Sequence, residues 1–128
     1  MPQANRARVL IIDDDADVLD MVSALLGALG CDVVGMAKNG AEGYDLFKAQ
    51  RPDLTLLDIQ MPVMDGLETL KKIRRTDKEA AVVMLTSVDE TVVAEHCCHG
   101  GAKGWLRKDM SVEELSQSLQ QEVNNLAK

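Results

Sequence analysis

An apolar run that stops at three adjacent aspartates is the feature that most constrains how this chain can fold. Residues 8–12 are typical of a buried strand, and Asp13, Asp14 and Asp15 follow without a break. Carboxylates this close raise one another's pKa and resist joint ionisation. A hard divalent cation with oxygen ligands removes that conflict. The pattern therefore predicts a strand end that carries a cation or another positive group.

The rest of the chain alternates between short apolar runs and segments with helical periodicity. Strands are expected over residues 8–12, 31–36, 53–57, 80–85 and 103–107. The apolar stripes of the expected helices are Val18, Val22, Leu25, Leu26 and Leu29, capped by Gly30; Ala41, Tyr44, Leu46 and Phe47; Leu67, Leu70 and Ile73; a weak stripe over 91–99; and Leu115, Leu119, Val123 and Leu126. Five alternations without a repeat or linker predict a doubly wound α/β fold, with a parallel five-stranded sheet covered on both faces.

Polar residues stand at the carboxyl ends of four of these strands. Asp13 and Asp14 follow the first strand, Asp58 the third, Thr86 the fourth and Lys108 the fifth. In open parallel sheets, ligands bind beyond this edge, near the point where the strand order reverses. We therefore expect these side chains to share one site.

Side chains of these types suit phosphoryl transfer. Three carboxylates can hold Mg²⁺, which readily shares its coordination shell with a phosphate. A carboxylate can attack phosphorus and form an aspartyl phosphate, while a lysine and a hydroxyl neutralise the phosphoryl oxygens. Asp58, at the end of a central strand, is best placed as the nucleophile.

The composition predicts a single cytoplasmic domain over residues 1–128. The net charge of −7 argues against nucleic-acid binding by this domain. No apolar run is long enough to cross a bilayer, and the N-terminus lacks the apolar core of a signal peptide. Three cysteines without a spaced framework fit a reducing compartment. We expect no membrane partner, and a monomer or weak dimer.

Four segments together resemble the receiver domain of two-component response regulators, as found in single-domain chemotaxis regulators. They are IIDDDADV, LTLLDIQMPVMDGLETL, VVMLTS and GAKGWLRKD, and the resemblance covers roughly residues 7–127. It implies a flavodoxin-like (βα)5 sheet with strand order 2-1-3-4-5. It also implies a signalling module rather than an enzyme, one that catalyses only its own phosphorylation and dephosphorylation.

The resemblance assigns a role to each residue of the site. Asp58 would accept the phosphoryl group from a phosphohistidine on a sensor histidine kinase or phosphotransfer protein. Mg²⁺ would be bound by Asp13, Asp14 and Asp58, with the backbone carbonyl of Gln60 as a further ligand.

Three more residues complete the implied mechanism. Lys108 would pair with the phosphoryl group and Thr86 would donate its hydroxyl to it. The aromatic residue Trp105 would turn inward as Thr86 moves, reshaping the face of the fourth helix, fifth strand and fifth helix that binds an unknown downstream protein.

Three positions depart from the family pattern. Asp109 replaces the proline that usually follows the lysine, often after a cis bond; a cis bond before a non-proline residue costs about 3–4 kcal/mol. We expect a trans Lys108–Asp109 bond, with stored strain as the alternative. Trp105 replaces the usual Tyr or Phe, and Ser87 stands where alanine is commonest.

Other functions are weighed against this one. A Mg²⁺-dependent phosphatase with an aspartyl phosphate usually carries a second acid where this chain has Gln60. A phosphorylation-independent binding module usually lacks part of the site that is complete here. Asp13 and Asp14 could also serve only as a helix cap and first-turn acid.

Two further clusters have simpler explanations than a site. His96, Cys97, Cys98 and His99 could suggest zinc, but we expect Cys97 in the core and the histidines in solvent, because no second ligand cluster exists. The basic residues Lys71, Lys72, Arg74 and Arg75 are expected on the solvated face of the third helix.

Overall fold

The computed structural model describes residues 6–126, apart from the side chain of Val88. Its elements are β1 (Arg8–Ile12), α1 (Ala16–Ala28), β2 (Asp32–Ala37), α2 (Gly40–Gln50), β3 (Leu54–Asp58), α3 (Gly66–Thr76), β4 (Val82–Thr86), η2 (Val88–Glu90), α4 (Thr91–His99), β5 (Gly104–Arg107) and α5 (Val112–Asn125). The domain was expected over residues 1–128, and its ends, residues 1–5 and 127–128, lie outside the described residues. The expected core, residues 7–127, is described except for its last residue. Within the described range, no helix is both long and apolar enough to cross a membrane.

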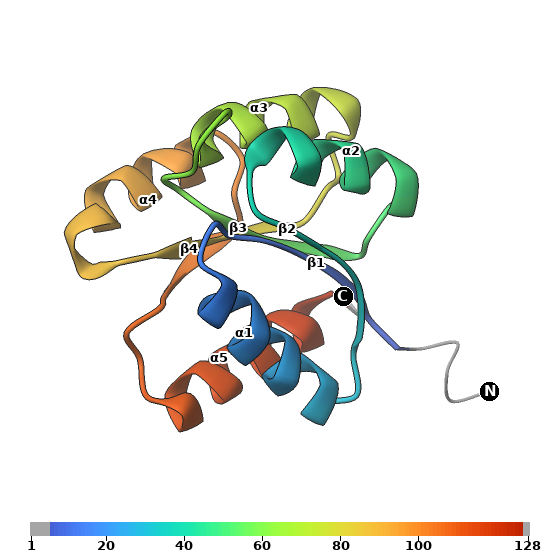
Figure 1. Cartoon of the computed structure of the whole chain (residues 1–128), viewed down its shortest axis with the longest axis vertical. Helices are drawn as coiled ribbons and strands as arrows, with labels where there is room; N and C mark the ends of the chain where they lie inside the picture. Colours follow the sequence, from blue (N-terminus) through green and yellow to red (C-terminus); the bar gives the residue numbers. More distant parts are fainter. Residues whose placement is uncertain (1–5, 127–128) are drawn as a thin grey trace.

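The strands form one parallel sheet in the order β2-β1-β3-β4-β5. This confirms the predicted doubly wound α/β fold. Figure 1 shows α1 and α5 on one face of the sheet and α2, α3 and α4 on the other. The strand order reverses between β1 and β3, whose residues Ile12 and Leu57 are register partners. The residues that follow these two strands therefore come together at the reversal point.

The central strands are apolar along their whole length because helices cover both of their faces. In β1, Val9 and Ile11 pack into the core shared with α1 and α5, whereas Leu10 and Ile12 pack into the core shared with α2, α3 and α4. This alternation has the two-residue period of a strand. Two cores, one on each face, thus fix the register of β1 and hold its carboxyl end in place.

Four of the five strands start one or two residues later than predicted, and β2, β3 and β4 also end one residue later. Cys31 does not join β2, because its N–H donates to the carbonyl of Leu26 at the end of α1, with N···O 3.0 Å. Ala80 lies outside β4 for a similar reason, since its N–H donates to the carbonyl of Asp77 at 3.2 Å. Leu19, absent from the predicted stripe of the first helix, is 5% exposed and belongs to the core.

Candidate functional site

The three carboxylates expected together do meet at the carboxyl edge of the sheet. Asp13 follows β1, Asp58 ends β3, and Asp14 precedes α1; one oxygen from each lies within 4.8 Å of the others. Asp13 and Asp58 are buried and Asp14 is exposed. The N-cap of α1 is Asp15, whose side chain accepts a hydrogen bond from the N–H of Asp17. The interpretation of Asp13 and Asp14 as a helix cap and first-turn acid is therefore wrong.

Lys108 brings a positive charge into this cluster. Its Nζ lies 2.8 Å from Oδ2 of Asp13 and 2.8 Å from Oδ1 of Asp58. Its backbone N–H donates to the carbonyl of Thr86, N···O 2.8 Å, which fixes where the side chain leaves the sheet. Burial alone would lower the pKa of Lys108, but its pairing with the carboxylates of Asp13 and Asp58 outweighs burial, and the pKa is raised. The lysine is therefore an ammonium throughout the neutral range.

Burial is the main influence on the nucleophile candidate, Asp58. Removal from water raises its pKa from 3.8 to about 7, against the opposing hydrogen bond from Lys108 and with a further rise from the charge of Asp13. Oδ1 of Asp58 also accepts a hydrogen bond from the N–H of Ile59, N···O 2.8 Å. The side chain is thus fixed through one oxygen and titrates close to neutral pH.

The donor set of the cluster fits a magnesium ion. Oδ1 of Asp13 accepts a hydrogen bond from the N–H of Asp15 at 2.9 Å. Its buried Oδ2 receives no hydrogen bond of good geometry, although Lys108 Nζ is close. A buried carboxylate oxygen without a full set of partners is costly, and oxygen donors are those that Mg²⁺ prefers. Between residues 6 and 126 no other group of three acidic, histidine or cysteine side chains comes as close together.

Thr86 and Trp105 lie on the neighbouring strands. Thr86 ends β4, one position past Leu85, the register partner of Asp58. It is fully buried, and its hydroxyl donates to the backbone carbonyl of the next residue, Ser87, at 3.0 Å. Trp105 is the register partner of Met84 and is half-buried against the core on the side of α2, α3 and α4.

The loop between β3 and α3 wraps tightly around the end of β3. Gln60 lies in it with an exposed side chain. Val63 is the centre of a γ-turn, with φ +71° and a hydrogen bond from the N–H of Met64 to the carbonyl of Pro62 at 2.7 Å. Gly66 closes the loop by donating to the carbonyl of Ile59 at 2.6 Å.

Gly66 is a structural requirement of the site that the sequence analysis missed. A Cβ atom at this position would overlap the carbonyl oxygen of Asp58 and lie 2.8 Å from Cα of Ile59. The available signal was the Asp65-Gly66 pair before a helix, because glycine is common where two backbone segments approach closely.

The sequence analysis also missed an ion pair between Arg107 and Asp109, the residues on either side of Lys108. Arg107 donates through Nε and a terminal nitrogen to both carboxylate oxygens of Asp109, at 2.9 and 2.5 Å. The Lys108–Asp109 bond is trans, as expected, since no peptide bond in the described chain is cis. Opposite charges two residues apart around the lysine were the available signal.

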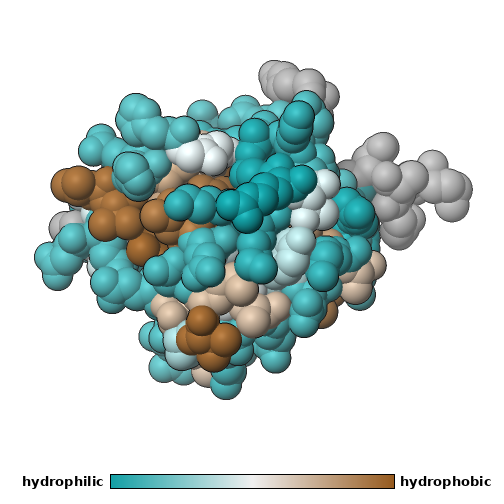
Figure 2. Space-filling model, turned by 90° about the horizontal axis from the view of Figure 1, so that it is seen from above, coloured by the Kyte–Doolittle hydropathy of each residue, from teal (hydrophilic) through white to brown (hydrophobic). Residues whose placement is uncertain are grey.

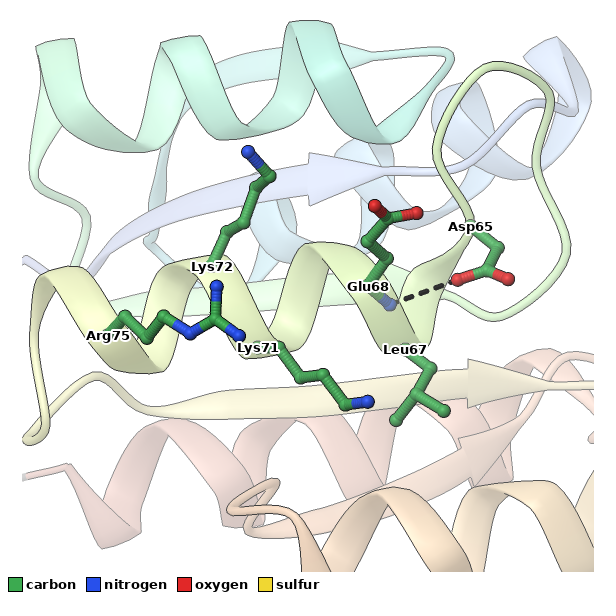
Figure 3. A pocket seen from close by; sticks show the side chains of 6 residues that line it. All are labelled: Asp65, Leu67, Glu68, Lys71, Lys72 and Arg75. Carbon is green, nitrogen blue, oxygen red and sulfur yellow. Dashed lines mark hydrogen bonds between the residues drawn. The ribbon is translucent and has the colours of Figure 1, made fainter.

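The predictions for the two remaining polar clusters hold except at Arg74, which is half-buried and donates through Nη1 to the carbonyl of Ala80 at 3.2 Å. Cys97 is fully buried, whereas His96 and His99 are exposed, so this segment packs rather than gathers ligands. The other three basic residues of α3 border a surface hollow of about 400 Å³ that contains none of the clustered acids. It is lined by Asp65, Leu67, Glu68, Lys71, Lys72 and Arg75 (Figure 3).

Comparisons with known proteins agree with this geometry. Residues 9–120 match the family model described as response regulator receiver domain. The chain is 32% identical to chemotaxis protein CheY of Bacillus subtilis over 117 residues, which is 91% of this chain and 98% of that protein. It is 39% identical to the nitrate/nitrite response regulator NarL of Escherichia coli K12 over 124 residues, 94% of this chain but only 56% of that protein. A chain in the crystal structure of the CheX–CheY–BeF3–Mg complex from Borrelia burgdorferi superposes with a TM-score of 0.83 at 27% identity, covering 90% of this chain and 87% of that one.

Proposed function

Because the chain belongs to the response regulator receiver domain family, we propose that it is a phosphorylation switch of a two-component phosphorelay, with Asp58 as phosphoacceptor. The observation that carries this proposal is the contact between buried Asp58 and Lys108, beside Asp13 and Asp14. It combines a carboxylate nucleophile, a fixed cation and two further oxygen ligands at one strand edge. Phosphoryl transfer needs this kind of positioning and charge neutralisation.

We assign Mg²⁺ to the carboxylates of Asp13, Asp14 and Asp58, with the backbone carbonyl of Gln60 as a further ligand. When bound, the cation neutralises charge on the phosphoryl oxygens and so lets the group approach an acidic site. The incompletely satisfied Oδ2 of Asp13 supports this assignment. So does the likeness to the Borrelia burgdorferi complex, which contains both beryllofluoride and magnesium.

The hydrogen bonds of Asp58 suggest which oxygen reacts. Oδ1 accepts from Ile59 and is paired with Lys108, so we assign the attack to Oδ2. The bond from Oδ2 to phosphorus forms as the bond between phosphorus and a histidine nitrogen of the donor breaks. That nitrogen keeps the electron pair. The donor is a phosphohistidine of a sensor histidine kinase or phosphotransfer protein.

Dephosphorylation returns the site to its starting state. Water attacks phosphorus, inorganic phosphate leaves, and the carboxylate of Asp58 is restored. Throughout, Lys108 neutralises the developing charge. Receiver domains are signalling modules, and we propose that this chain catalyses only these two steps on itself.

We propose Thr86 as the residue that reads the phosphoryl group. To reach it, the Thr86 hydroxyl must exchange its bond to the carbonyl of Ser87 for one to a phosphoryl oxygen. A hydrogen bond to a charged group contributes about 1.5–3 kcal/mol, enough to shift a population between two states. The movement would change the packing of Trp105 on the adjacent strand.

The proposed output face comprises α4, β5 and α5. Figure 2 shows a hydrophobic patch at the end of the molecule where α4 lies, and this helix exposes Val92 and Val93, which are 76% and 41% exposed. A downstream protein with an apolar contact surface would cover them. Because the cysteines are free thiols, we place the domain in the cytoplasm, as for its proposed kinase partner.

The fluorescence of Trp105, the only tryptophan, tests the switch. Beryllofluoride with Mg²⁺ should change its emission beyond the effect of Mg²⁺ alone. Asp58→Asn should abolish this extra change, and Thr86→Ala should reduce it. If emission and the amide spectrum of residues 89–110 are the same with and without beryllofluoride, the proposed output face is wrong.

A further inference from the structure

The outer face of α3 carries charges of opposite sign at its two ends. Asp65 and Glu68 lie at the N-terminal end, and Lys71, Lys72 and Arg75 lie toward the C-terminal end. In Figure 3 the side chain of Lys72 points toward α2 and that of Lys71 points to the other side of α3, so the basic charges spread across the width of the helix. Four of the chain's 14 lysines and arginines fall on this helix although the net charge is −7. The face is therefore strongly polarised along the helix axis.

These charges are not neutralised by the rest of the chain. The ion pairs among residues 6–126 all involve other side chains. Asp65 only caps the helix, accepting a hydrogen bond from the N–H of Glu68 at 3.0 Å. The Nζ of Lys72 lies 5.5 Å from the centre of the Tyr44 ring. Lys71 and Arg75 are four residues apart, a spacing at which like charges destabilise a helix.

The two ends of the face are matched in sequence. Glu68 and Lys72 lie two residues to either side of Leu70, and Asp65 and Arg75 lie five residues to either side. When two copies of α3 run antiparallel about a two-fold axis level with Leu70, each acid of one copy lies level with a base of the other. The symmetry makes each of these contacts twice.

We propose that this face of α3 is a self-association surface, on which a second copy of the chain packs antiparallel. Glu68 pairs with Lys72 of the second copy, and Asp65 pairs with Arg75 of the second copy. Exposed ion pairs each contribute little, so the dimer is weak and is screened by salt. The surface is separate from the phosphorylation site.

A polyanion fits this face less well than a second copy does. Nucleic acid or a uniformly acidic peptide would meet the three cations but would also face Asp65 and Glu68. Only a partner with both signs of charge in the reverse order satisfies the whole face, and the chain itself carries that order.

Sedimentation velocity of the full chain at low ionic strength, without Mg²⁺ or phosphodonor, tests the proposal independently of phosphorylation. A concentration-dependent dimer that dissociates on addition of salt is expected. Glu68→Lys and Lys72→Glu should each raise the dimer dissociation constant about tenfold. Asp20→Lys makes the same charge reversal on α1, on the opposite face of the sheet, and should have no effect.

Restoring the charge match provides the sharper test. A 1:1 mixture of the Glu68→Lys and Lys72→Glu proteins should dimerise as the wild type does, and so should the variant that carries both changes. Thermal denaturation establishes that each variant is folded. If one of them is not, the Asp65→Arg and Arg75→Glu proteins form the equivalent matched pair. Three results would each overturn the proposal. The wild type could stay monomeric at low ionic strength, the charge reversals could leave the dissociation constant unchanged, or the mixture could dimerise no more tightly than its two components do alone.

Discussion

The ammonium of Lys108 and the carboxylate of Asp58 are 2.8 Å apart, although they follow β5 and end β3, which do not pair with each other. The lysine reaches past β4 and touches Asp13 after β1 at the same distance of 2.8 Å. One cation therefore joins the ends of three strands. It also compensates two buried carboxylates, which explains how an acidic site can fold without a bound metal.

Replacing Lys108 by methionine should therefore destabilise the metal-free protein in a pH-dependent way. Above pH 7, where Asp58 is ionised, two buried carboxylates would lose their cation, at a cost of about 1–3 kcal/mol. At pH 5, where Asp58 is protonated, the loss should be smaller. Urea denaturation in EDTA measures both values. Lys78→Met, at an exposed lysine, is the control; an equal loss at both pH values would contradict this account.

The pKa of Asp58 predicts how stability depends on pH. Its folded-state pKa of about 7 lies above the ordinary 3.8, so the folded state binds the proton more tightly. The resulting stabilisation is complete below pH 3.8 and is lost as the pH rises through about 7. In EDTA, the unfolding free energy of the wild type should fall relative to that of Asp58→Asn across this window, by up to about 1.4 kcal/mol per pH unit. Parallel pH profiles for the two proteins would refute the raised pKa.

Because Gly66 lies against the backbone of Asp58 and Ile59, alanine should be tolerated less well there than at a glycine with free space around it. Gly66→Ala should destabilise the protein by about 1–3 kcal/mol, because the new methyl group overlaps the backbone of Asp58 and Ile59. Gly27→Ala, in the last turn of α1, meets no atom within 4 Å and should stabilise by up to about 1 kcal/mol through helix propensity. Thermal denaturation of the two variants measures the cost of the overlap at Gly66 and the gain in helix propensity at Gly27. Similar changes in stability at both positions would show that the Gly66 contact is unimportant.

We predict that replacing Val63, in the same loop, by glycine stabilises the protein. It is a β-branched residue at φ +71° with 82% of its surface exposed, so its backbone is strained and its side chain contributes little packing. Strain of this kind costs about 1–3 kcal/mol, and Val63→Gly should recover part of it. Val112→Gly, at an exposed valine without a positive φ, should instead destabilise. A Val63→Gly protein with a lower melting temperature would show that the turn is not strained.

The fold was largely predictable because its signals are local. The apolar run before Asp13 lies within a few residues of the strand that it determines, and α4 begins and ends where expected. The grouping of Asp13, Asp58 and Lys108 was also predictable, because parallel strands deliver their carboxyl ends to one edge.

The features that were missed depend on contacts that no periodicity encodes. The closeness of Gly66 to Asp58 arises from the path of an irregular loop, and the Arg107–Asp109 pair arises from the rotamers of two exposed side chains. The predicted stripe of the first helix starts at Val18 and passes over Leu19, whereas the buried residues of α1 are Leu19, Val22 and Leu26, three or four residues apart.

The central claim, that Asp58 accepts a phosphoryl group, is tested most directly by intact-protein mass spectrometry after incubation with Mg²⁺ and acetyl phosphate. The wild type should gain one phosphoryl group that hydroxylamine removes, and EDTA should prevent the gain. Asp20→Asn, which removes an exposed carboxylate outside the cluster, should be modified as the wild type is, whereas Asp58→Asn should not be modified. Undiminished modification of the Asp58→Asn protein would contradict the assignment of Asp58.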